Sequence, residues 1–375
     1  MDKPVFTIIG AGNGGFCTAA DLTLRGYEVR LYESPEFADN IEPVLKKGGI
    51  ALRGVAGEGF AQPALVTTDI GTALMGAEII LVITTAQGHK PIARACVPFL
   101  GKGQTVVLVP GCVCGALEFR QELLKHGGSD EVILAETTSL MYAVKKENGN
   151  GVWARGFKKH LPLAALPVHH TQRVIDQLTP IFPQFSPVGN VLETSFNNLN
   201  HVVHPPGVLM NLGFTENPDQ KVWHFYPDGY TPGTGRIGDR LDEERLAIAK
   251  AYAIPATSIL EELDKYYGHQ GMSGDNLHEM FRDSPIHGHA KGPHSTNSRL
   301  LTEDVPFGLV PLASFGRLAG VPTPTMDAII TLSSVVNQTD YRQTGRTVES
   351  LGLGGFSVQE ILDFVSNGVR GNSKK

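Results

Sequence analysis

The sequence predicts an α/β protein in which a Rossmann-type, doubly wound domain is followed by a mostly α-helical domain. Its 375 residues exceed the roughly 250–300 residues that a single hydrophobic core usually organises. In the first half, short apolar runs typical of buried strands alternate with helical patterns, as in a parallel sheet covered by helices. After about Pro187 the strand-like runs become rare and longer helical patterns appear. We therefore expect one domain over residues 1–187 and a second over residues 188–375.

Composition and charge argue against several classes of partner. Hydrophobic residues make up 41% of the chain and charged residues 19%, and the formal net charge is −6. Because there is no long basic run, we do not expect nucleic acid or an acidic membrane surface as a partner. The N-terminus lacks the pattern of a signal peptide, and no apolar stretch approaches the roughly 20 residues of a membrane span. The four cysteines form no C-x-x-C pair, so we expect a cytoplasmic protein with reduced thiols.

The stretch "VFTIIGAGNGGFCTAADLTLRGYEVRLYES" predicts a strand, a helix and a second strand. Val5–Ile9 is an apolar, β-branched run that leads into a G-x-G-x-x-G motif. A helical pattern then continues to Gly26, and Glu28–Tyr32 is the second expected strand, with Glu33 at its end. The N-terminus of such a helix offers free N–H groups and a positive dipole end to phosphates. In this context the motif predicts a site for a dinucleotide cofactor.

Each glycine of the motif has its own physical role in such a site. Gly10 makes the tight turn, Gly12 lets the backbone approach a pyrophosphate, and Gly15 lets helix and strand pack closely. The carboxylate of Glu33 can accept hydrogen bonds from both ribose hydroxyls and would repel a 2′-phosphate, so we expect NAD, with NADP as the alternative. The predicted cofactor-binding residues are Gly10, Gly12, Asn13, Gly14, Gly15, Glu33, Thr84 and Gln87.

Three further apolar runs extend the predicted sheet. They cover residues 77–85, 104–110 and 131–138, and the loops after them begin at Ala86, Gly111 and Ser139. Ligands of a doubly wound sheet bind beyond the carboxyl ends of the strands, which places Thr84 and Gln87 on the cofactor side.

The second half has the pattern of helices. We expect helices over residues 242–252, 258–267 and 322–337, and a last helix that begins with the capping-box spacing of Ser357 and Glu360. We expect the active site in the cleft between the two domains.

The stretch "NNLNHVVHPPG" carries two histidines ahead of a Pro-Pro pair. Prolines are tolerated in the first turn of a helix, so we expect a helix to begin here, with His204 at or beside its N-cap and directed out of the fold. A histidine can give or take a proton near neutral pH, as the reduction of a C=O or C=N bond by hydride requires. For His201 a surface or hydrogen-bonded core position is the simpler interpretation.

Taken together, "NHVVHPPGVLMNLG", the N-terminal glycine motif and "SRLLTEDVPFGLVPLASFGRLAGVPTPTMDAII" resemble the octopine/nopaline dehydrogenase family, the opine dehydrogenases. The similarity covers nearly the whole chain. It implies reductive condensation, in which an amino acid joins a 2-oxo acid such as pyruvate and NAD(P)H reduces the imine. By position, the resemblance places the family's catalytic histidine on His204, and its arginine and aspartate on Arg299 and Asp304.

The residue types agree with these roles. Asp304 could fix the tautomer of His204 and stabilise its charged form, and Arg299 could hold a carboxylate of the substrate with two parallel hydrogen bonds. Asn200 and Asn211 could hold the amino acid or orient His204, and could equally cap helix ends. The amino acid stays open between arginine, a small neutral residue and a larger amine. The oligomeric state also stays open, with a homodimer as one option.

Two other functions compete with this one. Reductases similar to ketopantoate reductase or glycerol-3-phosphate dehydrogenase use a central lysine, and no lysine here stands in such a motif. A dinucleotide-sensing module would bind cofactor without turnover and would not require His204, Arg299 and Asp304 together. The loop "HGHAKGPHSTNS" contains H-x-H but no carboxylate or cysteine, so we expect no metal and instead a loop that closes over substrate.

Overall fold

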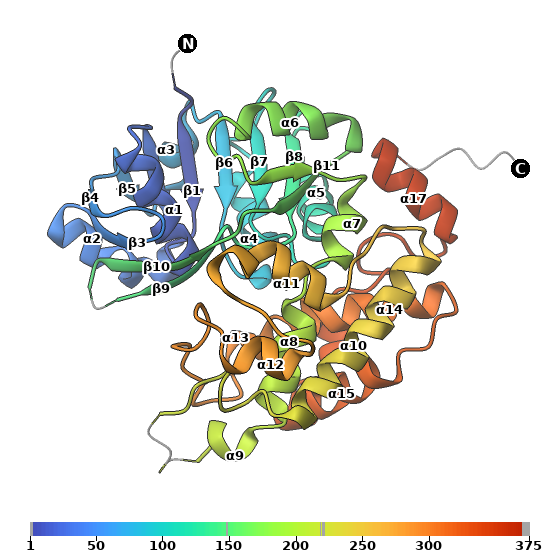
Figure 1. Ribbon diagram of the computed structural model, residues 1–375. Helices are drawn as coiled ribbons and strands as arrows, with labels where there is room; N and C mark the ends of the chain where they lie inside the picture. The colour runs from blue at the N-terminus through green and yellow to red at the C-terminus, as the bar shows by residue number, and fades with distance from the viewer. Residues whose placement is uncertain (1–2, 148, 218, 220–221, 370–375) are drawn as a thin grey trace, which may run out of the picture. The chain divides into compact units, whose positions relative to one another are not determined.

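In the computed structural model, the chain divides into two compact units. The structure describes residues 3–147, 149–217, 219 and 222–369. The first unit contains residues 1–111 and 115–191, and the second contains residues 112–114 and 192–375 (Figure 1). The expected class, a Rossmann-type sheet followed by a helical C-terminal part, is confirmed. Among the described residues, no helix combines the length and the apolar character that a membrane crossing requires.

The first unit is built on an eight-stranded sheet with the order β12-β11-β8-β7-β6-β1-β2-β5. Figure 1 shows β1, β6, β7 and β8 side by side in this sheet. The pairs from β8 to β5 are parallel, and β11 runs antiparallel to β8. The strands are β1 (Phe6–Ile9), β2 (Val29–Tyr32), β5 (Leu65–Thr67), β6 (Ile79–Val82), β7 (Thr105–Leu108), β8 (Ile133–Thr137), β11 (Leu161–Leu166) and β12 (Phe185–Pro187).

The strand order reverses at β1, and this reversal positions the cofactor-side residues. β1 pairs with β2 on one side and β6 on the other, so Ile9 lies opposite both Tyr32 and Val82. The carboxyl ends of these three strands therefore meet at one edge, which is the switch point where such sheets bind ligands. All four residues of β1, β6 and β7 are buried, as expected for strands covered on both faces.

Helices connect these strands, and the boundaries predicted for the first helix are close to the observed ones. The helix after β1 runs over Asn13–Leu24 and ends before Gly26, whose φ is +78°. The helical elements of this unit are α1 (Asn13–Leu24), η1 (Pro35–Asn40), α2 (Glu42–Lys47), α3 (Ile70–Leu74), η2 (Ala86–Gly88), α4 (His89–Cys96), α5 (Gly115–Lys125), η3 (Val168–His170) and α6 (Thr171–Leu178).

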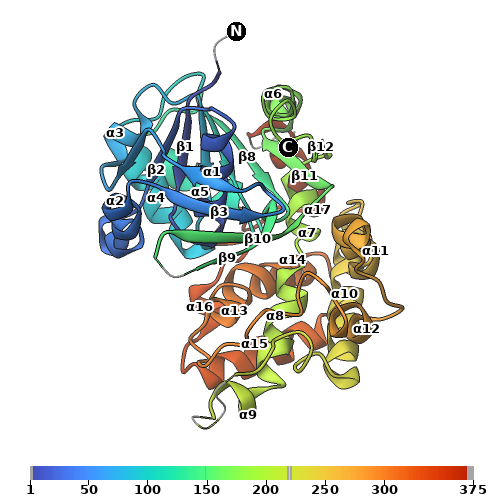
Figure 2. The same cartoon turned by 60° about the vertical axis from the view of Figure 1, so that its left-hand side comes forward.

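A second, four-stranded sheet packs against α1 and was not expected from the sequence. Its order is β4-β3-β10-β9, and the strands are β3 (Ile50–Gly54), β4 (Gly59–Ala61), β9 (Tyr142–Lys146) and β10 (Gly151–Phe157). Figure 2 shows β3, β10 and β9 side by side. The expectation of a loop from Ser139 onward is wrong after Met141, because the chain forms an antiparallel β9–β10 pair.

The second unit is helical, as expected. Its predicted helices lie in α10, α11 and α15, and the capping box of Ser357 and Glu360 is present in α17. The helical elements are α7 (Val191–Phe196), α8 (Asn200–Leu209), α9 (Leu212–Thr215), α10 (Pro232–Ala251), α11 (Ile259–Tyr267), η4 (Gly268–Gln270), α12 (Leu277–Arg282), α13 (Arg299–Thr302), the π-helical turn η5 (Val305–Leu309), α14 (Val310–Leu318), α15 (Pro324–Val336), α16 (Tyr341–Thr344) and α17 (Val358–Asn367).

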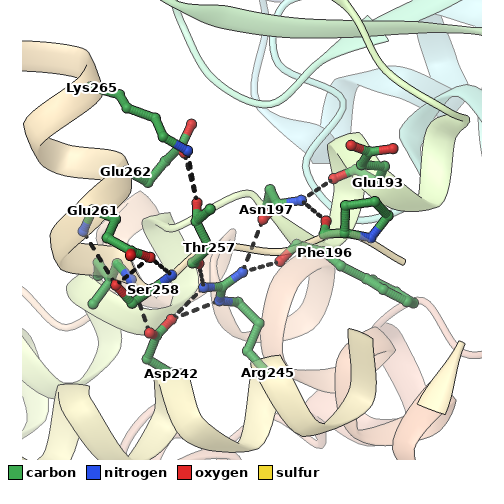
Figure 3. Close-up of polar contacts among 12 residues, drawn as sticks. Glu193, Phe196, Asn197, Asp242, Arg245, Thr257, Ser258, Glu261, Glu262 and Lys265 are labelled. Carbon is green, nitrogen blue, oxygen red and sulfur yellow. Dashed lines mark hydrogen bonds and ion pairs between the residues drawn. The ribbon is translucent and has the colours of Figure 1, made fainter. Parts of the chain in front are cut away.

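A buried arginine ties the loop before α8 to α10 and α11 (Figure 3). The guanidinium of Arg245 donates to Asp242 at 2.7 Å, to the carbonyl of Phe196 at 2.8 Å and to the carbonyl of Thr257 at 2.5 Å. Asn197 also accepts from Arg245, at 3.3 Å, and its own amide donates to two carbonyl groups. A charge this deeply buried is tolerated because it is paired and hydrogen-bonded. The network fixes the chain immediately before α8, the helix that contains His201 and His204.

Candidate active site

The glycine turn after β1 has the geometry that a dinucleotide requires. Gly10 has a φ of +103°, and a Cβ there would lie 2.5 Å from the carbonyl oxygen of Ile83. A Cβ on Gly15 would lie 1.7 Å from the carbonyl oxygen of Gly10, so only glycine lets α1 approach the turn this closely. A Cβ on Gly12 would meet no atom within 4 Å. Gly12 is the N-cap of α1, so a pyrophosphate can approach the N–H groups there.

Glu33 lies beside this turn, but its carboxylate is already engaged. Its side chain accepts from the main-chain N–H of Ala11 at 2.9 Å, from that of Ser34 at 2.9 Å and from Asn40 Nδ2 at 3.0 Å. A carboxylate has about four acceptor positions, so about one is left for a ribose hydroxyl. The expectation that Glu33 binds both hydroxyls therefore requires one of these donors to be displaced.

The other predicted cofactor residues lie around the same strand ends. Thr84 follows β6 and contacts the Gly10 turn, and its buried hydroxyl has no hydrogen-bond partner among the described residues. Gln87 is exposed in η2. A Cβ on Gly14 would lie 2.8 Å from Ile83 Cγ2, and Asn13 Oδ1 accepts from the main-chain N–H of Lys146. Asn13 thus has a structural contact in addition to its place at the motif.

The helix that contains His201 and His204, α8, begins earlier than expected. α8 starts at Asn200, so His204 lies in its second turn, with Pro205 and Pro206 inside the helix. The prediction that His204 stands near the N-cap and points out of the fold is wrong, because only 7% of the residue is exposed. Asn198 explains the difference, since its side-chain oxygen accepts from the main-chain N–H of Asn200 at 3.0 Å. This local bond starts the helix one turn ahead of the prolines.

His204 is held between a carboxylate and a phenol. Its Nδ1 lies 2.7 Å from Asp304 Oδ2, and both residues are buried. The carboxylate selects the tautomer with the proton on Nδ1, which leaves Nε2 free to exchange a proton. Tyr226 OH lies 3.4 Å from this Nε2. Tyr226 was not predicted from the sequence, because it lies in an irregular segment, "VWHFYPDGY", in which no spacing distinguishes it.

His201 occupies a different environment on the same helix. It is 1% exposed, and its Nε2 has no hydrogen-bond partner among the described residues. Burial, with the nearby charges of Arg245 and His204, lowers the pKa of His201 to about 3. Gly308 of η5 packs on it, since a Cβ there would lie 2.4 Å from His201 Cβ. His201 is therefore a neutral packing residue in the core, and the hydrogen bond expected for such a position is not found at its Nε2 among the described residues.

Arg299 and the residue four positions later form an ion pair at the start of α13. Arg299 Nη1 donates to Glu303 Oε2 at 3.4 Å, with 49% of the arginine side chain exposed and 7% of the glutamate side chain. Cys112 Sγ donates to the other oxygen of Glu303 at 3.6 Å. Burial beside Glu303 raises the pKa of the Cys112 thiol well above its ordinary value, which disfavours the reactive thiolate.

The two predicted asparagines lie on either side of His204 in sequence, and one has a clear structural role. Asn211 is buried, and its amide donates to the carbonyl groups of Gly207 at 2.9 Å and Gly229 at 3.0 Å. These bonds join the end of α8 to the segment that follows Tyr226. Asn211 makes no side-chain capping bond to α9. Asn200 is half-buried at the first residue of α8.

The loop over residues 286–298 is bound to the segment that carries Tyr226. His224 and Lys291 form a β-bridge, and Phe225 N–H donates to the carbonyl of Ala290 at 2.8 Å. The ring of His287 lies 4.7 Å from that of Tyr226. Within the described ranges, no three His, Cys, Asp or Glu residues group as metal ligands would. The loop therefore packs against the segment of Tyr226 and contacts its ring through His287.

Comparison of the sequence with a family model and with known relatives gives one family. Residues 187–337 match the model of the NAD/NADP octopine/nopaline dehydrogenase α-helical domain. An opine dehydrogenase of Arthrobacter sp. (strain 1C) is 35% identical over 97% of this chain and 99% of its own length. The structure of an octopine dehydrogenase with NADH and pyruvate has a TM-score of 0.72 at 20% identity, covering 96% of this chain and 98% of that one. A yersinopine dehydrogenase with NADP+ has a TM-score of 0.70 at 16% identity, covering 97% and 98%.

The resemblance found in the sequence is therefore confirmed, and the family match does not favour the reductases that use a central lysine. The chain belongs to the octopine/nopaline dehydrogenase family, the opine dehydrogenases, and is an NAD(P)-dependent oxidoreductase that acts on CH–NH bonds.

Proposed function

We propose that this enzyme condenses the amino group of an amino acid with the carbonyl group of a 2-oxo acid such as pyruvate, and reduces the product to a secondary amine. The observation that carries this proposal is the buried pair of His204 and Asp304, with Arg299 five residues before the aspartate. Family membership supports the reaction class. The reverse oxidation uses the same groups.

His204 moves the protons of the condensation. Its Nε2 takes a proton from the ammonium group of the amino acid, which makes the nitrogen a nucleophile for the carbonyl carbon. The protonated Nε2 of His204 then returns a proton to the hydroxyl group of the adduct. This group leaves as water, and an iminium ion remains. Asp304 stabilises the imidazolium between these two transfers. NADH, when bound, supplies the hydride that reduces the C=N bond.

Arg299 is proposed to bind the carboxylate of the 2-oxo acid. Its side chain is half-exposed and charged at every working pH, and its planar head can form two parallel hydrogen bonds. Glu303 holds one edge of the guanidinium and so restricts its orientation. Asn200 remains a proposed contact for the amino acid, whereas Asn211 is proposed to act by positioning the end of α8.

We propose NADH as the preferred cofactor, bound by Gly10, Gly12, Asn13, Gly14, Gly15, Glu33, Thr84 and Gln87. The fit rests on the open space at Gly12 and on the single remaining acceptor position of Glu33. The partners are these small molecules, without a metal. We further propose a cytoplasmic location, and a homodimer as the alternative to a monomer.

The test is oxidation of NADH with pyruvate, with and without a panel of amino acids. Pyruvate alone should give little or no turnover, and the right amino acid should start the reaction. Mass spectrometry should then find a secondary amine with two carboxylates. If the only product is the 2-hydroxy acid, the enzyme is an ordinary reductase and the proposal is wrong.

A further inference from the structure

Lys146, the last residue of β9, lies beside the glycine turn although it is 135 residues from Ala11 in the chain. Its ammonium group donates to the carbonyl of Ala11 at 3.2 Å and to that of Asn40 at 3.3 Å, and lies 3.7 Å from the centroid of the Phe16 ring. Its main-chain N–H donates to Asn13 Oδ1 at 2.8 Å. Three contacts thus position the ammonium group, and a fourth holds the main chain of Lys146.

Lys146 and Glu33 share two neighbours. Ala11 and Asn40 donate to the Glu33 carboxylate through N–H groups and accept from Lys146 through their carbonyl oxygens. Burial lowers the pKa of Lys146, and the Glu33 carboxylate opposes this by favouring the charged form. The cation therefore lies within electrostatic reach of the carboxylate that is expected to accept from the ribose.

We propose that Lys146 is a cofactor-specificity residue, whose ammonium group binds a 2′-phosphate and allows NADPH to use the site in spite of Glu33. This inference rests on the proposed function, because it requires a dinucleotide at the glycine turn. An ammonium group has three N–H donors, and the carbonyl groups of Ala11 and Asn40 take two of them. About one donor remains for a phosphate oxygen, which lysine binds as a point charge.

A structural role for Lys146 makes a different prediction. If the side chain only joined β9 to the turns at Ala11 and Asn40, its loss would weaken both cofactors alike. A role in specificity requires the loss to fall on the phosphorylated ribose. Lys145 provides the matched control, because it is the exposed preceding residue of β9 and its side chain points to the opposite face of the strand.

The experiment measures binding of two fragments, 5′-ADP and 2′,5′-ADP, by calorimetry on the full-length protein, so that no turnover is needed. In Lys146→Met the dissociation constant of 2′,5′-ADP should rise roughly tenfold or more, as expected for one charge-assisted hydrogen bond. That of 5′-ADP should change less than about twofold. Lys146→Arg should keep most of the affinity for 2′,5′-ADP, and Lys145→Met should leave both constants unchanged.

Each outcome decides a separate point. Equal weakening of both fragments in Lys146→Met, or no change in either, overturns the role of Lys146 and leaves the proposed function intact. If the wild-type protein binds neither fragment, the dinucleotide site fails, and the proposed function fails with it. Selective loss of 2′,5′-ADP in Lys146→Met, restored in Lys146→Arg, supports the inference.

Discussion

Replacing Asp304 by asparagine removes a charge while keeping the shape of the side chain, and isolates the contribution of the carboxylate to proton transfer. The Asp304–His204 contact of 2.7 Å is buried at both ends. Two unit charges about 4 Å apart interact by about 4 kcal/mol at an effective dielectric constant of about 20. Since about 1.36 kcal/mol corresponds to tenfold in rate, complete loss of this interaction would slow proton transfer about 10³-fold. A neutral amide keeps part of the hydrogen bond, so we expect kcat to fall by roughly 10²–10³.

The assay is steady-state oxidation of NADH with pyruvate and an active amino acid, both at saturation. The dissociation constant of NADH, measured by fluorescence, should stay near the wild-type value, because Asp304 does not belong to the glycine turn. Glu303→Gln is the control, since it removes the neighbouring carboxylate without touching His204. It should mainly raise the Michaelis constant for the 2-oxo acid, because Arg299 loses its ion pair. If Asp304→Asn keeps more than half of kcat, the proposed stabilisation of the imidazolium is refuted.

Three further predictions follow from separate features of the structure. His204→Ala should lower kcat by roughly 10²–10⁴ with unchanged affinity for NADH, whereas His201→Ala should retain most of its turnover. Gly12→Ala should raise the dissociation constant of NADH roughly tenfold but leave the free energy of unfolding unchanged in urea titration, because a Cβ there meets no atom within 4 Å. The pKa of His201 is lowered to about 3 in the fold, against about 6.5 unfolded. The unfolded chain therefore binds more protons between these values, and stability falls as the pH drops through that window. His201 should lower the free energy of unfolding by about 1.6 kcal/mol between pH 6.5 and pH 5, and urea titrations at both pH values should show a smaller loss in His201→Gln.

The parts of the fold that depend on local sequence were predictable. Gly15 is required by its contact with Gly10 inside one strand–turn–helix unit, and Ser357 caps its own helix three residues ahead of Glu360. Such features are encoded over a few residues, so their spacing identifies them. The start of α8 was mispredicted although its cause is also local, because the two prolines suggested a first turn while Asn198 had already started the helix.

The second sheet could not be predicted in the same way. β3 pairs with β10 across about a hundred residues, with Ala51 opposite Gly151, and no periodicity in either segment specifies its partner. The Asn and Gly residues at 148–151 were a usable turn signal. Lys146 belongs to β9, the neighbour of β10 in this sheet, and no local pattern links it to the glycine turn, so it was not among the predicted cofactor residues.

The pairing of His204 with Asp304 spans 100 residues, and the resemblance together with the chemistry of the residue types suggested it, not the spacing. The structure adds a reason why two adjacent carboxylates have different partners. Glu303 lies four residues after Arg299, on the same face of the α13 turn, and accepts from it. At Asp304 the chain changes to the π-helical turn, whose main-chain bond runs from Leu309 N–H to the Asp304 carbonyl. Successive side chains of a helix point roughly 100° apart, and the next carboxylate, that of Asp304, contacts His204 instead. The spacing R-x-x-x-E-D thus couples the proposed substrate anchor to the proton-transfer pair, so that a shift of one should displace the other.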